Sequence, residues 1–284
     1  MTLRISNATV DAIELLLIRH DHRGMSRIRQ ALNPGYLGRA AELLRAQRGI
    51  AYIITGFPVA GSFETDGPAG AMALYRLCEQ IQLQPVIVSE HSLTQCLAPT
   101  LRCLELAAGT REEVEQSVRD LYKQTAPALI ISIERPGAAK NGRYYNMAGV
   151  DISANCSPAE PYLELAPCPI IAIGDGGNEL GMGKAIAALD GMDIHPAICT
   201  CDELIVADVS NWGAYALCAL TYAQHETIPD ISAALREDLA FLVAAGAVDG
   251  VTGKRLATED GFPADAGAEL VDRVIELLHR GNEL

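Results

Sequence analysis

Short apolar runs alternate with segments whose apolar residues recur every three or four positions along most of this chain. The apolar runs contain about five residues each and are rich in Ile, Val and Leu, which is typical of strands buried on both faces. They predict six strands, at 50–56, 85–90, 102–107, 128–134, 168–174 and 203–209. The periodic segments predict helices at 7–21, 38–49, 71–81, 111–124, 178–189, 213–225, 231–246 and 268–280.

This alternation predicts an α/β fold, with an open, mostly parallel sheet of about six strands and helices on both faces. We find no linker rich in Pro, Gly or Ser and no internal repeat, so residues 1–284 are predicted to form a single domain. Residues 134–169 hold the longest irregular stretch. Long irregular segments in compact domains are usually functional, and we expect this one to be a covering loop or small subdomain over an active site.

Composition narrows the possible partners. The 284 residues are 49% hydrophobic and carry a net charge of -14, with a pI of about 4.8. Such an acidic chain is a poor ligand for nucleic acids and anionic membranes, and a bound cation is easier to accommodate. No run approaches the roughly 18 apolar residues of a membrane span. Eight irregularly spaced cysteines suggest reduced thiols and a cytoplasmic protein. The apolar helices leave a homodimer possible.

Polar residues follow the predicted strands at the ends where ligands collect in open α/β sheets. Carboxylates from several strands would therefore share one edge of the sheet. The candidates after the first strand are Thr55, Gly56, Glu64 and Asp66; Glu134 and Arg135 follow the fourth; Asp175, Asn178 and Glu179 follow the fifth; and Asp208, Ser210 and Asn211 follow the sixth.

The stretch "IIAIGDGGNELGMGK" has more glycines than a simple turn needs. We predict that Gly176 and Gly177 let the backbone approach a ligand while Asp175 and Glu179 face a metal. Clustered carboxylates repel one another unless a cation neutralises them, and hard oxygen ligands suit Mg²⁺, Mn²⁺ or Ca²⁺.

Each of these features also has a structural explanation. The glycine stretch is neither a dinucleotide-binding nor a Walker motif and could be a plain turn. Glu64 and Asp66 could cap a helix, and Glu134 and Arg135 could form a surface ion pair. Asp151 and Ser153 could be turn residues.

Six motifs in order resemble the D-glutamate cyclase family. They are "TGFPVAGSFETDGPAGA", "ERPG", "NGRYYNMAGVDIS", "IGDGGNELGMGK", "VADVSNWGAYAL" and "GAVDGVTGKRLATEDGFP", which together run from Thr55 to Phe262. The resemblance implies an α/β domain with a divalent-metal site. It also implies a hydro-lyase that converts D-glutamate to 5-oxo-D-proline and water.

With this reaction in view, the candidate residues take the following roles. Mg²⁺ or Mn²⁺ would be held by Glu64, Asp66, Asp175, Asn178 and Glu179 and would polarise the γ-carboxylate. Glu134 would transfer protons, and Asp175 is the second catalytic candidate. The substrate, a small acidic amino acid, would be bound by Thr55, Gly56, Arg135, Tyr145, Asn146, Asp151, Ser153, Gly176, Gly177 and Asn211, with Arg135 gripping its α-carboxylate.

Two alternatives remain open from the sequence. A metal-dependent phosphatase acting on a small phosphorylated metabolite would use the same metal to activate water. A non-catalytic binder of a small acidic metabolite would bind without turnover. The small number of basic residues near the predicted site favours an amino acid over a polyphosphate.

Overall fold

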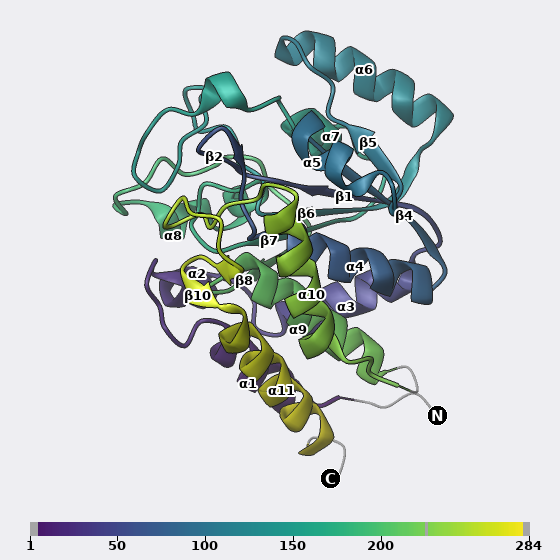
Figure 1. Ribbon diagram of the computed structural model, residues 1–284, viewed down its shortest axis with the longest axis vertical. Helices are drawn as coiled ribbons and strands as arrows, with labels where there is room; N and C mark the ends of the chain where they lie inside the picture. Colours follow the sequence, from purple (N-terminus) through teal and green to yellow (C-terminus); the bar gives the residue numbers. More distant parts are fainter. Residues whose placement is uncertain (1–4, 225–226, 281–284) are drawn as a thin grey trace.

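A six-stranded, all-parallel sheet forms the centre of the protein, as a computed structural model of residues 5–224 and 227–280 shows (Figure 1). The strand order is β5-β4-β1-β6-β7-β8. The strands are β1 (Gly49–Thr55), β4 (Leu83–Ser89), β5 (Cys103–Glu105), β6 (Pro127–Ile133), β7 (Ile170–Gly174) and β8 (Glu203–Val206). Two short hairpins, β2 (Pro58–Val59) with β3 (Ser62–Phe63) and β9 (Thr258–Glu259) with β10 (Phe262–Pro263), lie outside this sheet.

The strand order reverses between β1 and β6, the two central strands. From β1 the chain builds outward through β4 and β5, and then returns to add β6, β7 and β8 on the other side of β1. Tyr52 pairs with Ile130, and Thr55 with Ile133, in this central junction. Loops diverge at such a reversal and leave a crevice at the carboxyl ends of the strands, which is where open α/β sheets bind ligands.

Helices cover both faces of the sheet. In Figure 1, α6 and α7 lie on one side, and α3, α4 and α9 lie on the other with α1, α10 and α11 further out. The buried Leu93 and Leu97 of α5 belong to the same core cluster as α3, α4 and α9. The helices are α1 (Asn7–Leu17), α2 (Met25–Ala31), α3 (Tyr36–Ala46), α4 (Pro68–Gln80), α5 (His91–Leu97), α6 (Arg111–Gln124), α7 (Glu160–Glu164), α8 (Ile186–Leu189), α9 (Ser210–Ala223), α10 (Ile231–Ala244) and α11 (Ala264–Arg280). Short 3-10 turns occupy Ser153–Asn155 and Met182–Ala185.

Helix α9 is buried along all of its 14 residues. It is enclosed because it packs against strands β6, β7 and β8 on one side and against α4 and α11 on the others. Its sequence is correspondingly apolar around the whole circumference, as is expected of a helix with no solvent face. This burial fixes the position of the N-terminus of α9, which lies at the carboxyl edge of the sheet.

The predicted fold class is confirmed, since the sheet has six parallel strands with helices on both faces. The predicted helix at 178–189 is wrong in its first half. Residues 178–181 form a loop, and helical structure begins only at the 3-10 turn of Met182–Ala185. The reason is local. The Glu179 carboxylate accepts hydrogen bonds from the backbone N–H groups of Gly176 and Gly177, which precede it, and Gly181 has a left-handed φ of +94°. The predicted helix at 213–225 ends at Ala223, and position 225 lies outside the described residues.

Two further expectations concern membranes and thiols. Over residues 5–224 and 227–280, no helix combines the length and the apolar character needed to cross a bilayer. All eight cysteines are free thiols.

Candidate functional site

The N-terminus of α9 gathers carboxylates from two different strand ends. The backbone N–H of Ser210 donates to Asp66 Oδ2 and to Asp175 Oδ2, both at 3.0 Å. The N–H of Asn211 donates to Asp66 Oδ1 at 2.7 Å. The first N–H groups of a helix have no partner within it and carry partial positive charge, so they stabilise anions placed there. Asp66 lies between β3 and α4, in the connection that follows β1, and Asp175 directly follows β7. The helix end holds the two carboxylates side by side.

Glu134 lies next to this pair at the end of β6. Its Oε2 accepts a hydrogen bond of 2.5 Å from Ser210 Oγ, and Glu134 is only 6% exposed. Its backbone has a φ of +43°, which is uncommon for a residue with a Cβ and is often found at functional sites. Burial raises the pKa of Glu134 well above the usual carboxyl range, and nearby Asp175 and Glu179 raise it further.

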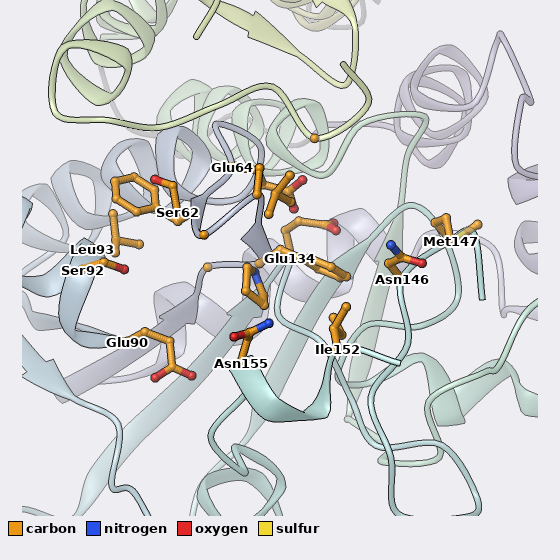
Figure 2. Close-up of a pocket in the computed structure, with 18 of the residues that line it drawn as sticks. Ser62, Glu64, Glu90, Ser92, Leu93, Glu134, Asn146, Met147, Ile152 and Asn155 are labelled. Atoms are coloured by element: carbon orange, nitrogen blue, oxygen red, sulfur yellow. The ribbon is translucent and has the colours of Figure 1, made fainter. Parts of the chain in front are cut away.

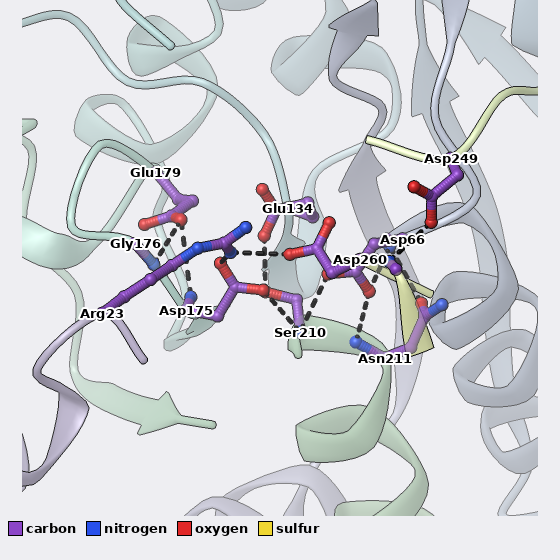
Figure 3. A network of polar contacts seen from close by, with 12 residues as sticks. Arg23, Asp66, Glu134, Asp175, Gly176, Glu179, Ser210, Asn211, Asp249 and Asp260 are labelled. Atoms are coloured by element: carbon purple, nitrogen blue, oxygen red, sulfur yellow. Dashed lines mark hydrogen bonds and ion pairs between the residues drawn. The ribbon is translucent and has the colours of Figure 1, made fainter. Parts of the chain in front are cut away.

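Asp260 and Arg23 complete the cluster from distant parts of the chain (Figure 3). Asp260 lies in the turn between β9 and β10, and Arg23 lies in the loop between α1 and α2. The Arg23 guanidinium donates to Asp175 and forms an ion pair of 2.6 Å with Asp260. The interaction with Asp175 is the main reason that the pKa of Arg23 is raised above its ordinary value.

Two groups of carboxylates are close enough to share a cation. The oxygens of Asp66, Asp175 and Asp260 lie within 4.8 Å of one another, and so do those of Glu134, Asp175 and Glu179. Asp175 belongs to both groups. Burial raises the pKa of Asp66 well above its ordinary value, with Asp175 and Asp260 adding to the effect. Burial and Asp175 likewise raise the pKa of Asp260 to about 7. These carboxylates repel one another, and a dication would remove that repulsion.

Buried oxygens without partners support the presence of a ligand at this position. Glu64 Oε1, Asn178 Oδ1 and Thr55 Oγ1 are buried and have no hydrogen-bond partner among the described residues. An unpaired buried polar atom costs about 1–3 kcal/mol, so native proteins rarely leave several in one place. Glu64 and Asn178 both line the adjoining cavity. Carboxylate and amide oxygens are the donors preferred by Mg²⁺ and Mn²⁺, so these residues fit a hard divalent cation.

The glycine-rich loop is shaped by Glu179. Glu179 Oε1 accepts from the N–H of Gly176 at 2.7 Å, and Oε2 accepts from the N–H of Gly177 at 2.7 Å. Gly177 has a φ of +101°, and a Cβ at that position would lie 2.6 Å from Ile194 Cδ1. Glycine is therefore needed there for both conformation and space. The loop is closed by its own carboxylate, and this arrangement directs Asp175 toward the N-terminus of α9.

A cavity of about 800 Å³ opens beside the carboxylates (Figure 2). Glu64 and Glu134 face each other at its centre in Figure 2, with Asn146 and Ile152 on one side. Its walls come from the β2–β3 hairpin, the start of α5, the 146–155 part of the covering segment and the β9–β10 region. Arg23, Glu64, Glu134 and Asp260 line the cavity, so this part of the acidic cluster is open to a small molecule, whereas Asp66 and Asp175 lie buried behind it.

Arg135 lies apart from this cavity. It is fully buried, and its guanidinium donates to Gly56 O at 3.2 Å, Glu90 Oε1 at 2.8 Å and Ser157 O at 2.7 Å. These contacts tie the end of β1 to the covering segment. Both Nη atoms of Arg135 bond within the protein, and its buried Nε has no partner among the described residues. Arg23 is the arginine that contacts Asp175 and Asp260.

Asn211 is also fully buried and bonded. Its Oδ1 accepts from the N–H of Gly67 at 2.9 Å and of Gly70 at 2.7 Å. Its Nδ2 donates to Thr65 O at 3.2 Å and to Glu259 Oε1 at 2.9 Å. The amide therefore joins α4, α9 and the β9–β10 hairpin, and its polar atoms are all used within the protein.

The remaining predicted substrate residues divide between cavity and surface. Asn146 lines the cavity, although its Oδ1 accepts from the N–H groups of Ala148 and Val150. Tyr145 stacks on His195, with ring centroids 3.9 Å apart. Gly56 also lines the cavity, whereas Thr55, Gly176 and Gly177 are buried and do not line it.

Asp151 and Ser153 lie in an external turn of the covering segment. Asp151 is exposed and pairs with Arg143 at 2.5 Å, while its Oδ1 accepts from the N–H of Ser153 at 3.0 Å. Neither residue lines the cavity.

The sequence analysis did not select Arg23, Asp260 or Glu259 as site residues. Glu259 is buried and accepts from Asn211, Trp212 and Tyr215, which anchors the turn that carries Asp260. Asp260 and Glu259 lie within the motif "GAVDGVTGKRLATEDGFP", so their position in a recognised motif was an available signal. Arg23 has no comparable signal, because it follows a helix and lies outside all six motifs.

Comparison with known proteins places the chain in a family. A family model described as "D-glutamate cyclase-like, C-terminal" matches residues 15–275. The chain is similar to the mitochondrial D-glutamate cyclase of Homo sapiens, with 32% identity over 219 residues. That match covers 66% of this chain and 36% of the human protein, so the chain spans little more than a third of its relative. The chain therefore belongs to the D-glutamate cyclase-like C-terminal family.

Proposed function

We propose that this protein is a divalent-metal-dependent D-glutamate cyclase that forms 5-oxo-D-proline and water. The observation that carries the proposal is the convergence of Asp66, Asp175, Asp260 and Glu134 at the crevice between β1 and β6. Family membership supplies the reaction class.

The cation would be Mg²⁺ or Mn²⁺, held by Asp66, Asp175 and Asp260, with Glu64 and Asn178 as further oxygen donors. When bound, it would withdraw charge from the substrate γ-carboxylate, which is otherwise a poor electrophile. The buried, unpaired oxygens of Glu64 and Asn178 favour this donor set.

Glu134 is suited to move protons. The reaction joins the α-nitrogen to the carbon of the γ-carboxylate and releases one oxygen of that carboxylate as water. The α-ammonium loses two protons and the departing oxygen gains two, so a single carboxylate can relay both and no external acid is needed. Burial raises the pKa of Glu134, which increases the proton affinity of its carboxylate and suits it to take up and return protons. Ser210 Oγ orients the carboxylate through its hydrogen bond.

The charge of the cavity disfavours the phosphatase alternative. Arg23 is the one arginine or lysine among the described residues of the cavity lining. A phosphorylated metabolite would bring at least one further negative charge to a wall that already holds Glu64, Glu134 and Asp260. A zwitterionic amino acid brings a positive ammonium that these carboxylates can bind.

The test is a turnover assay with the purified chain. We expect D-glutamate with Mn²⁺ or Mg²⁺ to yield 5-oxoproline, measured by chiral chromatography, and we expect EDTA to abolish it. Glu134→Gln and Asp175→Asn should lose activity by about 10²-fold or more, whereas the exposed Glu237→Gln should retain it. Phosphate release from p-nitrophenyl phosphate without lactam formation would support the phosphatase instead. Binding without any turnover would support the non-catalytic binder.

A further inference from the structure

Arg23 contacts the same carboxylates that are grouped for a cation. Its guanidinium bridges Asp175 and Asp260, two of the three members of the Asp66, Asp175 and Asp260 group (Figure 3). A guanidinium and a divalent cation both require the lone pairs of these oxygens. The Arg23 side chain is 23% exposed, whereas that of Asp175 is fully buried. Arg23 therefore reaches a buried anionic centre from its solvent side.

We propose that Arg23 is a built-in competitor of the divalent cation: it neutralises Asp175 and Asp260 while the cation is absent and withdraws from them when the cation binds. The inference rests on the cation site of the proposed function, and it extends that function by giving the site a resident counter-charge.

The backbone that carries Arg23 is fixed in place. Asp208, at the end of β8, accepts from the N–H groups of His20 at 2.7 Å and Asp21 at 2.8 Å. The Asp21 carboxylate accepts in turn from the N–H of Ser26 at 2.8 Å and from its Oγ at 2.6 Å. Because both flanks of the loop are anchored, withdrawal of Arg23 needs only rotation of its side chain. Its partial exposure gives the guanidinium a route to water.

The charges around Arg23 explain why such a residue is useful. Glu64, Glu134 and Glu179 surround the same centre as Asp175 and Asp260. Without any cation, these buried groups would have to take up protons or move apart. A guanidinium keeps the carboxylates close together, so the ligands are already assembled when a dication arrives. The cost is that the dication must displace an ion pair, which weakens its apparent affinity.

The test measures cation binding and uses no substrate. Free Mn²⁺ is followed by its electron paramagnetic resonance signal during titration of the whole chain. Arg23→Met should bind Mn²⁺ about tenfold more tightly than the wild type, a difference equivalent to about 1.4 kcal/mol. Arg23→Lys should remain close to the wild type because the charge persists. Arg143→Met removes an exposed arginine that pairs with Asp151 and should leave Mn²⁺ affinity unchanged.

Equal or weaker Mn²⁺ binding by Arg23→Met overturns the inference, and so does absence of Mn²⁺ binding by the wild type. If Arg23→Met does not fold, the wild type labelled with ¹⁵N-arginine provides the same decision. The Nε–H resonance of Arg23 is assigned as the one that is missing from the spectrum of Arg23→Lys. Titration with Mg²⁺ should shift this resonance, and Mg²⁺ binding without that shift overturns the inference. A protein that meets these expectations but forms no 5-oxoproline refutes the proposed reaction alone.

Discussion

Replacement of Asn211 by leucine should destabilise the whole protein. Leucine is similar in shape to asparagine but has no polar atoms. The substitution would leave the N–H of Gly70 without its side-chain acceptor. It would also remove one hydrogen bond each from the N–H of Gly67, from Thr65 O and from Glu259, which keep other partners. The residue is fully buried, so water cannot replace the lost amide.

The size of the effect follows from these four contacts. The unpaired N–H of Gly70 costs about 1–3 kcal/mol, and each of the three other lost hydrogen bonds costs about 0.5–1.5 kcal/mol. Because the site relaxes in part, we expect Asn211→Leu to lower the free energy of unfolding by at least about 3 kcal/mol. This is a large share of the roughly 5–15 kcal/mol that stabilises a typical domain. For a chain of this size, the melting temperature should fall by on the order of 10 °C.

Circular dichroism during thermal and urea unfolding provides the measurement. Asn33→Leu, at an exposed position, is the matched control and should change the free energy of unfolding by less than about 0.5 kcal/mol. If Asn211→Leu unfolds like Asn33→Leu and loses only catalytic activity, Asn211 is a substrate-binding residue and our account of it as an internal clamp is refuted.

Three other predictions concern the neighbouring groups. Ser210→Ala removes the hydroxyl that stabilises ionised Glu134, so the acidic limb of the pH profile of 5-oxoproline formation should move to higher pH; an unchanged profile would contradict the role of Ser210. The pKa values of Asp260 and Glu259 are raised to about 7, so the folded protein holds more protons than the unfolded chain between about pH 4 and 7. In EDTA, the free energy of unfolding should therefore fall as the pH rises through this range. A free energy of unfolding that stays constant from pH 5 to 8 would contradict the raised pKa values. Gly177→Ala forces a side chain into a left-handed, crowded position and should lower the free energy of unfolding by about 1–3 kcal/mol, whereas the exposed, uncrowded Gly142→Ala, also at positive φ, should cost less when measured in urea.

The sheet and its strand-end carboxylates could be predicted because both depend on local patterns. Strands buried on two faces must be apolar, and parallel strands place all their carboxyl ends on one edge. Asp66, Glu134 and Asp175 follow three such strands, so their proximity follows from topology once the strands are identified. Neither the register of the strands nor any distance was required.

The roles of the two arginines could not be predicted in the same way. Arg135 directly follows β6 next to Glu134, which made it a reasonable choice for substrate binding. Its direction depends on side-chain packing: the guanidinium donates to Glu90 and Ser157 and forms no ion pair with Asp66, Asp175 or Asp260 among the described residues. No strand-end rule distinguishes the two directions available to a long side chain.

Arg23 raises the opposite difficulty, because its place in the site depends on tertiary contacts far apart in sequence. The loop before α2 is held by Asp208, 188 positions after His20, and the partner Asp260 arrives on a hairpin anchored by Glu259. A pattern confined to neighbouring residues contains neither contact. The charge balance gives the one general indication: several buried carboxylates at one edge need a positive group nearby. The sequence predicts a divalent cation for that purpose, and the structure shows that Arg23 contacts oxygens of the same carboxylates. The Mn²⁺ affinity of Arg23→Met therefore tests whether the arginine and the cation compete.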